Sequence, residues 1–493
     1  MKLRKLLKDI PVQIVKGTKE VEITGICSNS KLVSPGNLFV AKKGFTHNGA
    51  QFIADAVAAG AAAVLTDIYD PFLEDVVQII HPDVVAIEAK IAAEYYRHPS
   101  QDLLIIGITG TNGKTTCSYL IKHLMDGIGK QCGLMGSIER IIGKNYVPAP
   151  QNTPDAITNQ KLLHEMGLNE CKAAVMEVSS HGLDQGRVRE IDFDIAIFTN
   201  LTLDHLDYHK TMENYAAVKA KLFSTLGTET TNRKKKGKKF AVANADSPWF
   251  EAILGNCKES ILTYGIEKKA DVWASDIKLS SKGTSFTVNY QNENSRFSTA
   301  LIGRFNVYNC LAAITAGIGQ NLPLDRILGT LSTFKTVPGR LERVANKKGL
   351  NIFVDYAHSD DALKNVLETL KEIKSGKLIT VFGCGGDREV SKRPKMGEIA
   401  EQFSDFTIVT SDNPRNEDPE SIIKQIIAGF KLAKHYIVEP DRMEAISKAI
   451  KMAKQEDIVL VAGKGHETYQ IFAHQTIEFD DRKVAAAACE AQS

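Results

Sequence analysis

The sequence predicts an α/β protein made of three domains, each built around its own sheet. The chain has 493 residues, several times the common domain size of about 150 residues. Apolar runs typical of buried parallel strands alternate with segments of helical period along most of the chain. This alternation is interrupted near residues 98–102 and again near 334–342. We therefore expect domains at residues 1–101, 102–335 and 336–493.

The composition argues against several classes of protein. Lys and Arg total 61 against 59 Asp and Glu, so the net charge of +2 provides no cationic field for nucleic acid or anionic lipid. The basic stretch 232–239 is interpreted as a solvated loop. The eight cysteines form no C-x-x-C pair, and the start of the chain lacks the apolar run of a signal peptide. No stretch approaches a membrane span, which needs about 20 apolar residues. We expect a reduced, cytoplasmic monomer that neither binds nucleic acid nor inserts into a membrane.

The first two expected domains contain clear strand and helix signals. Residues 37–41 are typical of a strand, and residues 52–65 combine helical spacing with a small-residue turn and a second strand. Residues 103–108 (LLIIGI) form a continuous apolar run, which is typical of a buried parallel strand. The stretches 173–178 and 194–200 are expected to belong to the same sheet.

The last expected domain repeats the alternation of strands and helices. Strands are expected within residues 351–358, 377–386, 405–414 and 457–466. Each of these stretches ends in glycine or polar residues, which suit turns at the ends of strands.

A glycine-rich loop, GTNGKTT, follows the apolar run at 103–108 and leads into a segment of helical spacing. Strand, glycine-rich turn, Lys-Thr and helix are the context of a phosphate-binding loop, here with the shorter spacing G-x-x-G-K-T. Backbone N–H groups and the helix N-terminus would hold phosphate, Lys114 would reach the terminal phosphates and Thr115 would bind Mg²⁺. The predicted nucleotide-binding residues of this loop are Gly110, Thr111, Asn112, Gly113, Lys114, Thr115 and Thr116.

Two further glycine clusters raise the question of a dinucleotide-binding oxidoreductase. Both fit the start of G-x-G-x-x-G, but Arg388 replaces the third glycine of one cluster and Thr468 that of the other. We interpret both as strand-end turns where the backbone approaches a ligand.

Two polar residues lie at the expected ends of central strands. Glu177 ends the stretch 173–178, and His205 follows the stretch 194–200. Ligands of open α/β sheets bind at the carboxyl ends of strands. With Thr115, these side chains are candidate ligands of a divalent metal, while a polar loop that caps a helix explains the spacing equally well. No spacing of Ser, Cys, His and Asp points to a covalent nucleophile.

The loop at 411–415, SDNPR, brings Asp412, Asn413 and Arg415 together on a stretch that proline stiffens. Asx-Pro segments commonly start turns, so Arg415 can simply lie in solvent near Glu417 and Asp418. The residues of this loop alone leave its purpose open.

Nine short segments occur in one order and together carry a family resemblance. They are TGTNGKTT, MEVSSHGLDQGRV (176–188), TNLTLDHLDYH (199–209), GRFNVYN (303–309), PGRLE (338–342), VDYAH (354–358), GCGGDR (383–388), DNPR and GKGHE (463–467). In these segments, which span most of the chain, it resembles the Mur ligases of peptidoglycan synthesis. The likeness is closest to the type that adds the third residue of the stem peptide.

The resemblance implies an ATP-dependent, amide-forming ligase that activates a substrate carboxylate as an acyl phosphate. It implies a UDP-substrate-binding domain at 1–101 and a central ATP-binding domain with a P-loop ATPase-like parallel sheet at 102–335. The domain at 336–493 would be Rossmann-like and would bind the amino acid. The implied substrate is UDP-N-acetylmuramoyl-L-alanyl-D-glutamate, with ATP as co-substrate and Mg²⁺ as cofactor.

The resemblance also implies roles for single residues. Thr115 and Glu177 would hold one Mg²⁺, and Glu177, His205 and Lys219 a second, with Lys219 converted to a carbamate. From the residues alone, Lys219 and Lys221 would both be surface lysines of a helix. The implied catalytic residues are Lys114, Glu177, His205 and Lys219.

Further residues are assigned to the two nucleotides by the same resemblance. Around ATP it places Asn306, Asn309, Arg340, Asp355 and His358. Around the UDP-linked substrate it places Ser30, Asn152, Thr153, Ser179 and Arg187. The chain departs from the family pattern at Asn152, where a threonine is usual, and at Asn29-Ser30-Lys31, where the family has Asp-Ser-Arg.

The loop at 411–415 gains a specific interpretation from the resemblance. Ligases of this type that add meso-diaminopimelate carry D-N-P-R here, whereas those that add L-lysine lack the arginine. A planar cation suits bidentate binding of the extra carboxylate of meso-diaminopimelate. The predicted contacts are Arg388, Asp412, Asn413, Arg415, Gly463 and Glu467, with Glu467 facing the distal ammonium group. We therefore expect meso-diaminopimelate as the amino-acid substrate.

Three alternatives to this prediction are retained. The first is the same ligase adding L-lysine, and the second is a ligase like folylpolyglutamate synthetase, which would share the phosphate loop but not the D-N-P-R loop. The third is a P-loop switch or motor ATPase; a switch would carry the guanine-reading N-K-x-D, which is absent from this sequence.

Overall fold

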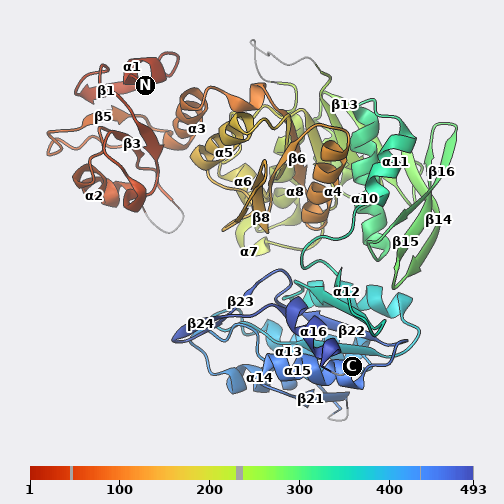
Figure 1. The fold of residues 1–493 in the computed structure, drawn as a ribbon. Coiled ribbons are helices and arrows are strands. Elements are labelled where there is room, and N and C mark those ends of the chain that lie inside the picture. The colour runs from red at the N-terminus through yellow and green to blue at the C-terminus, as the bar shows by residue number, and fades with distance from the viewer. Residues whose placement is uncertain (45–47, 229–236, 433–434, 492–493) are drawn as a thin grey trace. The chain divides into compact units, whose positions relative to one another are not determined.

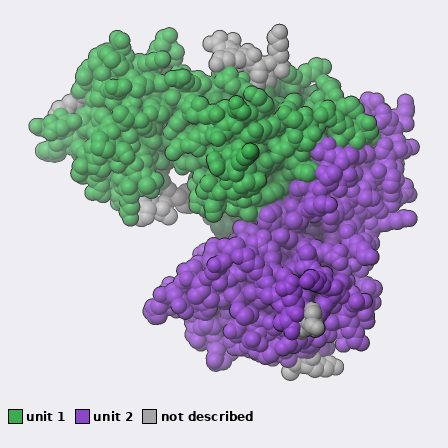
Figure 2. All heavy atoms as spheres, in the orientation of Figure 1, with its two compact units in different colours: residues 1–272, 312–327 green, residues 273–311, 328–493 purple. Residues whose placement is uncertain are grey.

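The computed structural model describes residues 1–44, 48–228, 237–432 and 435–491 (Figure 1). The described chain divides into two compact units, one of residues 1–272 and 312–327 and the other of residues 273–311 and 328–493 (Figure 2). Three sheets with flanking helices confirm the predicted α/β class. The boundaries at residues 101 and 335 stay predictions.

Most of the basic stretch 232–239 lies outside the described residues, because the description resumes only at residue 237. At its end, the prediction of a solvated loop is wrong for Lys239. This side chain is buried and forms an ion pair with Asp192. Lys239 directly precedes the buried strand β12 (Phe240–Asn244), so this end of the basic stretch belongs to the protein interior.

The first sheet has five strands in the order β1-β5-β4-β3-β2. All neighbours are parallel except β1 and β5. The strands are β1 (Gln13–Lys16), β2 (Gly25–Cys27), β3 (Asn37–Val40), β4 (Ala63–Thr66) and β5 (Val77–Ile80). The helices of this part are α1 (Leu3–Leu6), α2 (Ile53–Ala58) and α3 (Val84–Tyr95). The predicted strand at 37–41 and the predicted helix and strand at 52–65 are thus confirmed.

The central strands of the first unit follow the order β13-β12-β11-β6-β10-β7-β8-β9. From β13 to β7 all pairs are parallel, and the two pairs at the β9 edge are antiparallel. The strands are β6 (Leu104–Thr109), β7 (Cys132–Met135), β8 (Glu139–Ile142), β9 (Asn145–Pro148), β10 (Ala173–Glu177), β11 (Ile195–Phe198), β12 (Phe240–Asn244) and β13 (Ser260–Gly265). The helices are α4 (Lys114–Gly127), α5 (Ala156–Leu168), α6 (Ser180–Asp184), α7 (Leu206–His209), α8 (Met212–Ser224) and α9 (Phe250–Leu254). Because β6 is flanked by β10 and β11, the loops that follow these three strands open at one edge.

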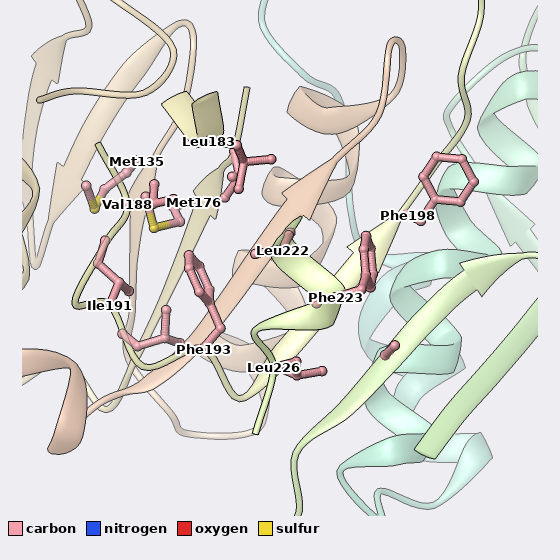
Figure 3. Packing of buried hydrophobic residues seen from close by; sticks show 14 of the residues in the cluster. Met135, Met176, Leu183, Val188, Ile191, Phe193, Phe198, Leu222, Phe223 and Leu226 are labelled. Atoms are coloured by element: carbon pink, nitrogen blue, oxygen red, sulfur yellow. The ribbon is translucent and has the colours of Figure 1, made fainter. Parts of the chain in front are cut away.

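Helix α8 is fixed to the sheet by a stripe of apolar side chains. Leu222 and Phe223 lie in the buried cluster that also contains Phe193 and Phe198 (Figure 3). The rings of Phe198 and Phe223 meet edge to face at 6.5 Å. A buried stripe of this kind fixes the rotation of α8 about its own axis, and this rotation determines which of its polar residues face the interior.

The second unit contains a small antiparallel element that the sequence analysis did not predict. Its strands are β14 (Val272–Ser280), β15 (Gly283–Tyr290) and β16 (Glu293–Thr299). Buried residues alternate with half-buried ones along most of β15, the pattern of a sheet with one covered face. Helices α10 (Arg304–Gly319) and α11 (Leu324–Ser332) follow.

The last sheet has the order β17-β18-β22-β19-β20-β21 and is parallel apart from β17. The strands are β17 (Glu342–Arg343), β18 (Asn351–Asp355), β19 (Leu378–Phe382), β20 (Phe406–Val409), β21 (Tyr436–Val438) and β22 (Ile458–Ala462). Along β18, Phe353 joins one core cluster while Ile352 and Val354 join another. The sheet is therefore covered on both faces, as the Rossmann-like prediction requires.

Two helix groups cover these faces. The first cluster receives α12 (Asp360–Ile373), α13 (Lys392–Phe403) and α14 (Pro419–Ile427), and the second receives α15 (Arg442–Met452) and α16 (Asp481–Glu490). A hairpin of β23 (Tyr469–Phe472) and β24 (Gln475–Glu478) follows the end of β22. The four predicted strands all form, and the four motif loops at 356–358, 383–388, 410–415 and 463–467 follow their carboxyl ends.

Candidate active site

The phosphate loop runs from the end of β6 to the start of α4. Gly113 adopts φ +86° as the residue that caps α4, and a Cβ at Gly110 would overlap the Thr199 hydroxyl. Asn200 binds this loop through its carbonyl, which accepts from Thr111 N at 2.9 Å, and its side chain, which accepts from Asn112 N at 2.9 Å. The segment 199–209 thus holds the loop in place. Since these two N–H groups bind protein, the predicted phosphate-binding amides are those at the start of α4.

Two lysines converge on one carbonyl of the loop. Lys114 Nζ donates to Gly110 O at 2.9 Å and to Thr111 O at 2.7 Å. Lys219 Nζ, which arrives from α8, donates to the same Gly110 O at 3.0 Å. The structure therefore places the predicted phosphate-binding lysine and the predicted carbamate lysine at a single point.

The interpretation of Lys219 as a surface lysine is wrong. Lys219 is only 1% exposed, whereas the side chain of Lys221 is 50% exposed. Lys219 lies one helical turn from both Tyr215 and Phe223, in the middle of the stripe that α8 buries. Burial first, and then the charge of Lys114, hold the pKa of Lys219 well below its ordinary value. A neutral amine is the form that reacts with carbon dioxide.

Glu177 is fully buried, and both of its carboxylate oxygens have partners on one residue. Oε1 accepts from Ser137 N at 2.9 Å, and Oε2 accepts from the Ser137 hydroxyl at 2.7 Å. Ser137 follows β7, the strand beside β10, and nothing in its local sequence pattern signals this contact with a residue 40 positions away. Its two donors fix the orientation of the carboxylate that is predicted to bind metal.

His205 caps α7 in the left-handed region, with φ +54°. Its Nδ1 lies 3.5 Å from Asp204 Oδ1, and its ring meets those of His181 and Tyr215 edge to face at 5.0 and 6.1 Å. Lys219 Nζ lies 4.6 Å from the centre of the Tyr215 ring. His205 and Lys219 thus share Tyr215 as a neighbour. The position of Tyr215 four residues before Lys219 was a helical signal that could have identified it.

No group of three His, Cys, Asp or Glu side chains arranged for metal binding occurs in the part of the chain that the structure describes. The predicted set contains only two such residues, Glu177 and His205, with Thr115 and Lys219 as the others. The donor set fits Mg²⁺ only if Lys219 contributes oxygen rather than an amine, because Mg²⁺ prefers oxygen ligands. The carbamate that the resemblance implies would supply that oxygen.

Thr153, Ser179 and Arg187, which are predicted to bind the UDP-linked substrate, lie together near the carboxyl end of β10. Thr153 is 1% exposed; its hydroxyl donates to Glu177 O at 2.9 Å and accepts from Ser179 N at 3.0 Å. Arg187 donates to Thr153 O at 2.9 Å. Asn152, the departure from the family pattern, is exposed beside them. Among the described residues, no hydrogen bond or ion pair joins Ser30 to this group.

The residues at 29–31 differ from the family pattern, but the backbone turn that they form is intact. Ser30 begins a short 3₁₀ helix, and the Asn29 side chain caps it by accepting from Lys31 N at 3.1 Å. Asn and Asp cap helices equally well, so asparagine in place of aspartate leaves this turn intact.

The predicted ATP residues of the second unit form two groups. In α10, Asn309 Nδ2 donates to Asn306 Oδ1 at 2.8 Å, and both side chains are buried. After β18, Asp355 accepts from Leu341 N at 2.7 Å, and burial raises its pKa. The Arg340 guanidinium lies 5.3 Å from the centre of the Tyr356 ring.

The Tyr356 ring joins this second group to the segment 463–467. It packs against His358 at 4.6 Å and His466 at 4.9 Å between ring centres. Burial lowers the pKa of both histidines, that of His466 to about 4. Both are therefore neutral imidazoles at neutral pH. The segment that carries Gly463 and Glu467 is thus packed directly onto the predicted ATP residues of the same unit.

The predicted amino-acid residues gather around Gly385. A Cβ at Gly385 would lie 2.9 Å from Arg415 Nη1 and 3.7 Å from Arg388 Cγ. Arg415 is half-buried and donates to Gly386 O at 2.8 Å, and Arg388 is exposed. The turn interpretation of Arg415 does not account for a guanidinium directed along the neighbouring glycine loop.

The remaining predicted residues of this pocket are joined to the arginine group. Asn413 Nδ2 donates to Glu467 Oε2 at 2.9 Å. A Cβ at Gly463, which has φ +115°, would lie 2.5 Å from Asp412 Oδ2, so only glycine fits there. The structure thus brings all six residues of the predicted pocket into one cluster at the carboxyl edge of the last sheet.

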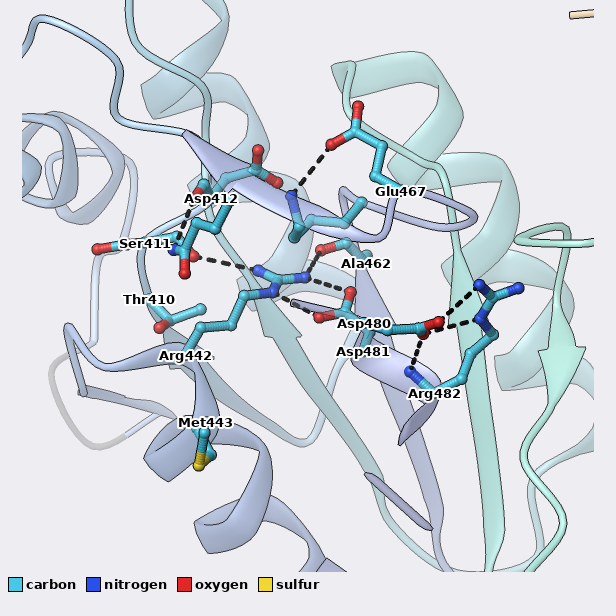
Figure 4. Close-up of polar contacts among 12 residues, drawn as sticks. Thr410, Ser411, Asp412, Arg442, Met443, Ala462, Glu467, Asp480, Asp481 and Arg482 are labelled. Atoms are coloured by element: carbon cyan, nitrogen blue, oxygen red, sulfur yellow. Dashed lines mark hydrogen bonds and ion pairs between the residues drawn. The ribbon is translucent and has the colours of Figure 1, made fainter. Parts of the chain in front are cut away.

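A buried arginine ties together the strand ends that carry this cluster. Arg442 makes a bidentate ion pair with Asp481, with both distances 2.8 Å (Figure 4). It also donates to Ala462 O at 3.0 Å and to Ser411 O at 3.3 Å. Burial opposes its charge most strongly, but the charge and hydrogen bonds of Asp481, together with the charges of Asp412 and Glu467, raise the pKa of Arg442. One guanidinium therefore sets the spacing of the loops at 411–415 and 463–467.

We expect Arg442→Met to lower the free energy of unfolding of the last domain by about 3–5 kcal/mol, because it leaves the buried Asp481 carboxylate without a partner. Urea denaturation followed by circular dichroism measures the effect. The control is Arg482→Met, which removes an arginine that is 24% exposed from its ion pair with Asp480. Equal losses in the two variants would contradict the role given to burial.

Three family models match the chain. They are "Mur ligase family, catalytic domain" at residues 22–97, "Mur ligase middle domain" at 108–317 and "Mur ligase, glutamate ligase domain" at 339–465. None of the described helices combines the length and apolar character that a bilayer crossing needs.

Similar proteins extend the likeness over the whole chain. The UDP-N-acetylmuramoyl-L-alanyl-D-glutamate–2,6-diaminopimelate ligase of Chlamydia pneumoniae is 45% identical over 486 residues, which are 98% of each protein. A solved structure with the same enzyme name is 34% identical, covers 100% of this chain and 99% of its own, and has a TM-score of 0.73. Folylpolyglutamate synthase of Mycobacterium tuberculosis is 16% identical with a TM-score of 0.61 and covers 83% of this chain and 94% of its own, which shows a shared fold alone. The phosphate loop, the carboxyl-edge cluster and these full-length matches agree: the chain belongs to the Mur ligase family.

Proposed function

We propose that the protein is an ATP-dependent ligase that adds meso-2,6-diaminopimelate to UDP-N-acetylmuramoyl-L-alanyl-D-glutamate in peptidoglycan precursor synthesis. The observation that carries this proposal is the cluster in the last domain. Arg388 and Arg415 flank Gly385 as cations for a carboxylate, and Glu467 is joined to them through Asn413 as an acceptor for an ammonium group. The full-length likeness to ligases named for this reaction supports it.

The reaction has two chemical steps. The substrate carboxylate attacks the γ-phosphorus of ATP, so that a bond to oxygen forms, the bond to the β-bridging oxygen breaks, and ADP leaves. The amine of the amino acid then attacks the carbonyl carbon of the acyl phosphate, and the C–O bond to phosphate breaks as the amine loses a proton. Lys114 and the amides at the start of α4 would hold the phosphoryl groups, so positioning and charge stabilisation carry the rate.

Lys219 is assigned as a carbamate. Its neutral nitrogen attacks the carbon of carbon dioxide, a C–N bond forms, an oxygen takes up the electron pair and the nitrogen loses one proton. The product is an anion, so that Lys114 attracts this side chain, whereas it would repel a protonated Lys219. The burial of Lys219 and its lowered pKa support this assignment because they favour the neutral amine.

Mg²⁺ is the implied cofactor, and the residues that would hold it are Thr115, Glu177, His205 and carbamylated Lys219. When bound, Mg²⁺ would neutralise charge on the phosphate oxygens. Ser137 would keep the Glu177 carboxylate in one orientation, and the ring of Tyr215 would pack against the side chain of Lys219. These supporting contacts matter because a ligand group that is free to rotate binds metal less tightly.

The proposal also assigns the two nucleotide sites. Thr153, Ser179 and Arg187, with Asn152 beside them and Ser30 in the first domain, are assigned to the UDP-linked substrate. The phosphate loop with Asn306, Asn309, Arg340, Asp355 and His358 is assigned to ATP.

We expect ADP release to require both the UDP-linked dipeptide and meso-diaminopimelate. A coupled assay of ADP with each substrate omitted in turn measures this, and mass spectrometry of the UDP product identifies the amino acid that was added. Lys114→Met is the control for contaminating ATPase activity. Vigorous hydrolysis without either substrate would favour a motor ATPase, and equal use of L-lysine would favour the lysine-adding alternative.

A further inference from the structure

Lys464 lies beneath the amino-acid cluster and has no assigned role. Its side chain is 0% exposed. Its Nζ donates to Asn413 Oδ1 at 3.0 Å and to Glu467 Oε2 at 3.0 Å, and it lies 5.5 Å from the centre of the Tyr469 ring. A buried ammonium group is costly unless it is paired, and Lys464 finds both of its polar partners on residues that are predicted to bind the substrate.

The contacts of Glu467 are divided unequally between its two oxygens. Oε2 accepts from both Lys464 Nζ and Asn413 Nδ2. Among the described residues, no hydrogen bond or ion pair reaches Oε1, and the side chain keeps 15% of its surface exposed. Glu467 is therefore held through one oxygen, which leaves the other available to a ligand.

We propose that Lys464 is a specificity-determining positioning residue, which makes the pocket select an amino acid with a distal carboxylate and ammonium group over one with the ammonium group alone. The inference rests on the proposed function, since it concerns the choice of amino acid by the same site. Lys464 acts through Glu467 and Asn413 and does not itself touch the substrate.

The physical argument is one of charge. Among the six predicted pocket residues and Lys464, the cations are Arg388, Arg415 and Lys464 and the carboxylates are Asp412 and Glu467, a balance of one net positive charge in which only Lys464 and Glu467 are directly paired. The distal end of meso-diaminopimelate carries both charges and is neutral, whereas that of L-lysine is a cation. The positive pocket therefore repels the cationic end of L-lysine and lowers the affinity for it relative to meso-diaminopimelate. Without Lys464 the pocket becomes neutral, and Glu467 gains attraction for a bare ammonium group.

The test compares kcat/KM for meso-diaminopimelate and L-lysine in Lys464→Met, Lys464→Arg and the unmutated enzyme. We expect Lys464→Met to lower the ratio of the two efficiencies by about tenfold or more, through a lower KM for L-lysine and a higher KM for meso-diaminopimelate. The KM values for ATP and the UDP-linked dipeptide should stay unchanged. Lys464→Arg keeps the charge and should restore most of the ratio.

Lys239→Met is the matched control, because it removes an equally buried lysine from its ion pair with Asp192 outside the pocket. It should leave the ratio unchanged even if it lowers thermal stability. The double variant Lys464→Met with Glu467→Gln tests the route of the effect. If Lys464 acts through Glu467, its replacement adds little to the change in ratio caused by Glu467→Gln alone.

An unchanged ratio in Lys464→Met, or an equal change in Lys239→Met, overturns the proposal. If Lys464→Met does not fold, Lys464→Gln is measured in its place, and a ratio like that of the unmutated enzyme overturns the proposal in the same way. The proposed function fails separately: if the unmutated enzyme does not add meso-diaminopimelate, the function is wrong whatever the variants do. If the unmutated enzyme prefers meso-diaminopimelate and the variants keep that preference, only the role of Lys464 is wrong.

Discussion

Lys219→Ala should lose ligase activity by about a thousandfold, because it removes the proposed carbamate, which would help to hold the Mg²⁺ that stabilises charge on the phosphoryl group. In the structure Lys219 is 1% exposed and shares Gly110 O with Lys114, which places its amine directly beside the phosphate loop. Small carboxylates such as acetate or formate should restore part of the activity, since they fit the cavity left by the side chain and supply the missing anion. Steady-state ADP release with and without added carboxylate measures both effects.

The matched control is Lys221→Ala, two residues along the same helix. Lys221 is 50% exposed and pairs with Asp184, so its loss should change activity little. A second readout is independent of turnover: ¹³C NMR in labelled bicarbonate should show a carbamate signal in the unmutated protein that Lys219→Ala lacks. Full activity of Lys219→Ala, or a carbamate signal that persists in it, would remove the carbamate from the mechanism.

Arg415→Ala should lower kcat/KM for meso-diaminopimelate by a factor of tens to thousands, which corresponds to about 2–5 kcal/mol for a partly buried ion pair. The loss should fall on the amino acid alone, because Arg415 lies on the loop after β20 and contacts Gly386 and Ile471 of the same domain. The KM values for ATP and the UDP-linked dipeptide should therefore stay near those of the unmutated enzyme. The efficiency with L-lysine should change little, since lysine brings no carboxylate to this guanidinium.

The variant Arg415→Lys separates two contributions of Arg415 to binding, its positive charge and the bidentate geometry of its guanidinium. Arg415 has φ +52°, a left-handed backbone that costs any non-glycine residue about 1–2 kcal/mol. Alanine and lysine share this backbone cost, so the difference between the two variants reports the side chain alone. Lysine offers a point charge without bidentate geometry and should recover only part of the efficiency. Equal preference for both amino acids in the unmutated enzyme would contradict this interpretation of the loop.

The parts of the site that depend on local pattern were predictable. The loop at 110–116 follows a continuous apolar strand and precedes a helix, which is enough to define a phosphate loop whatever surrounds it. The motifs after β18, β19, β20 and β22 were expected at strand ends, and parallel strands necessarily bring such ends to one edge. The clustering of Arg388, Arg415 and Glu467 follows from that topology.

Other features depend on contacts between distant segments. The residues alone could not separate Lys219 from Lys221, because a lysine in sequence signals exposure; the resemblance singled out Lys219, and the packing of α8 on the sheet decides which face is buried. Lys239 failed for the same reason, since its partner Asp192 is 47 residues away. The strands β14 to β16 were missed because the expectation of continued βα alternation left no place for an antiparallel element.

The sequence by itself determined the α/β class, the phosphate loop and the order of the motifs, because these follow from periodicity and from residues adjacent in the chain. The tertiary structure decided which oxygens of Glu177 bind Ser137, which lysine is buried beside the loop, and how Lys464 and Arg442 hold the amino-acid cluster. Apart from the contact of Lys464 with Glu467, these arrangements join residues 20 to 109 positions apart. Such contacts form only when the strands stand side by side, since a buried polar group takes whatever partner the packed fold brings within hydrogen-bond reach.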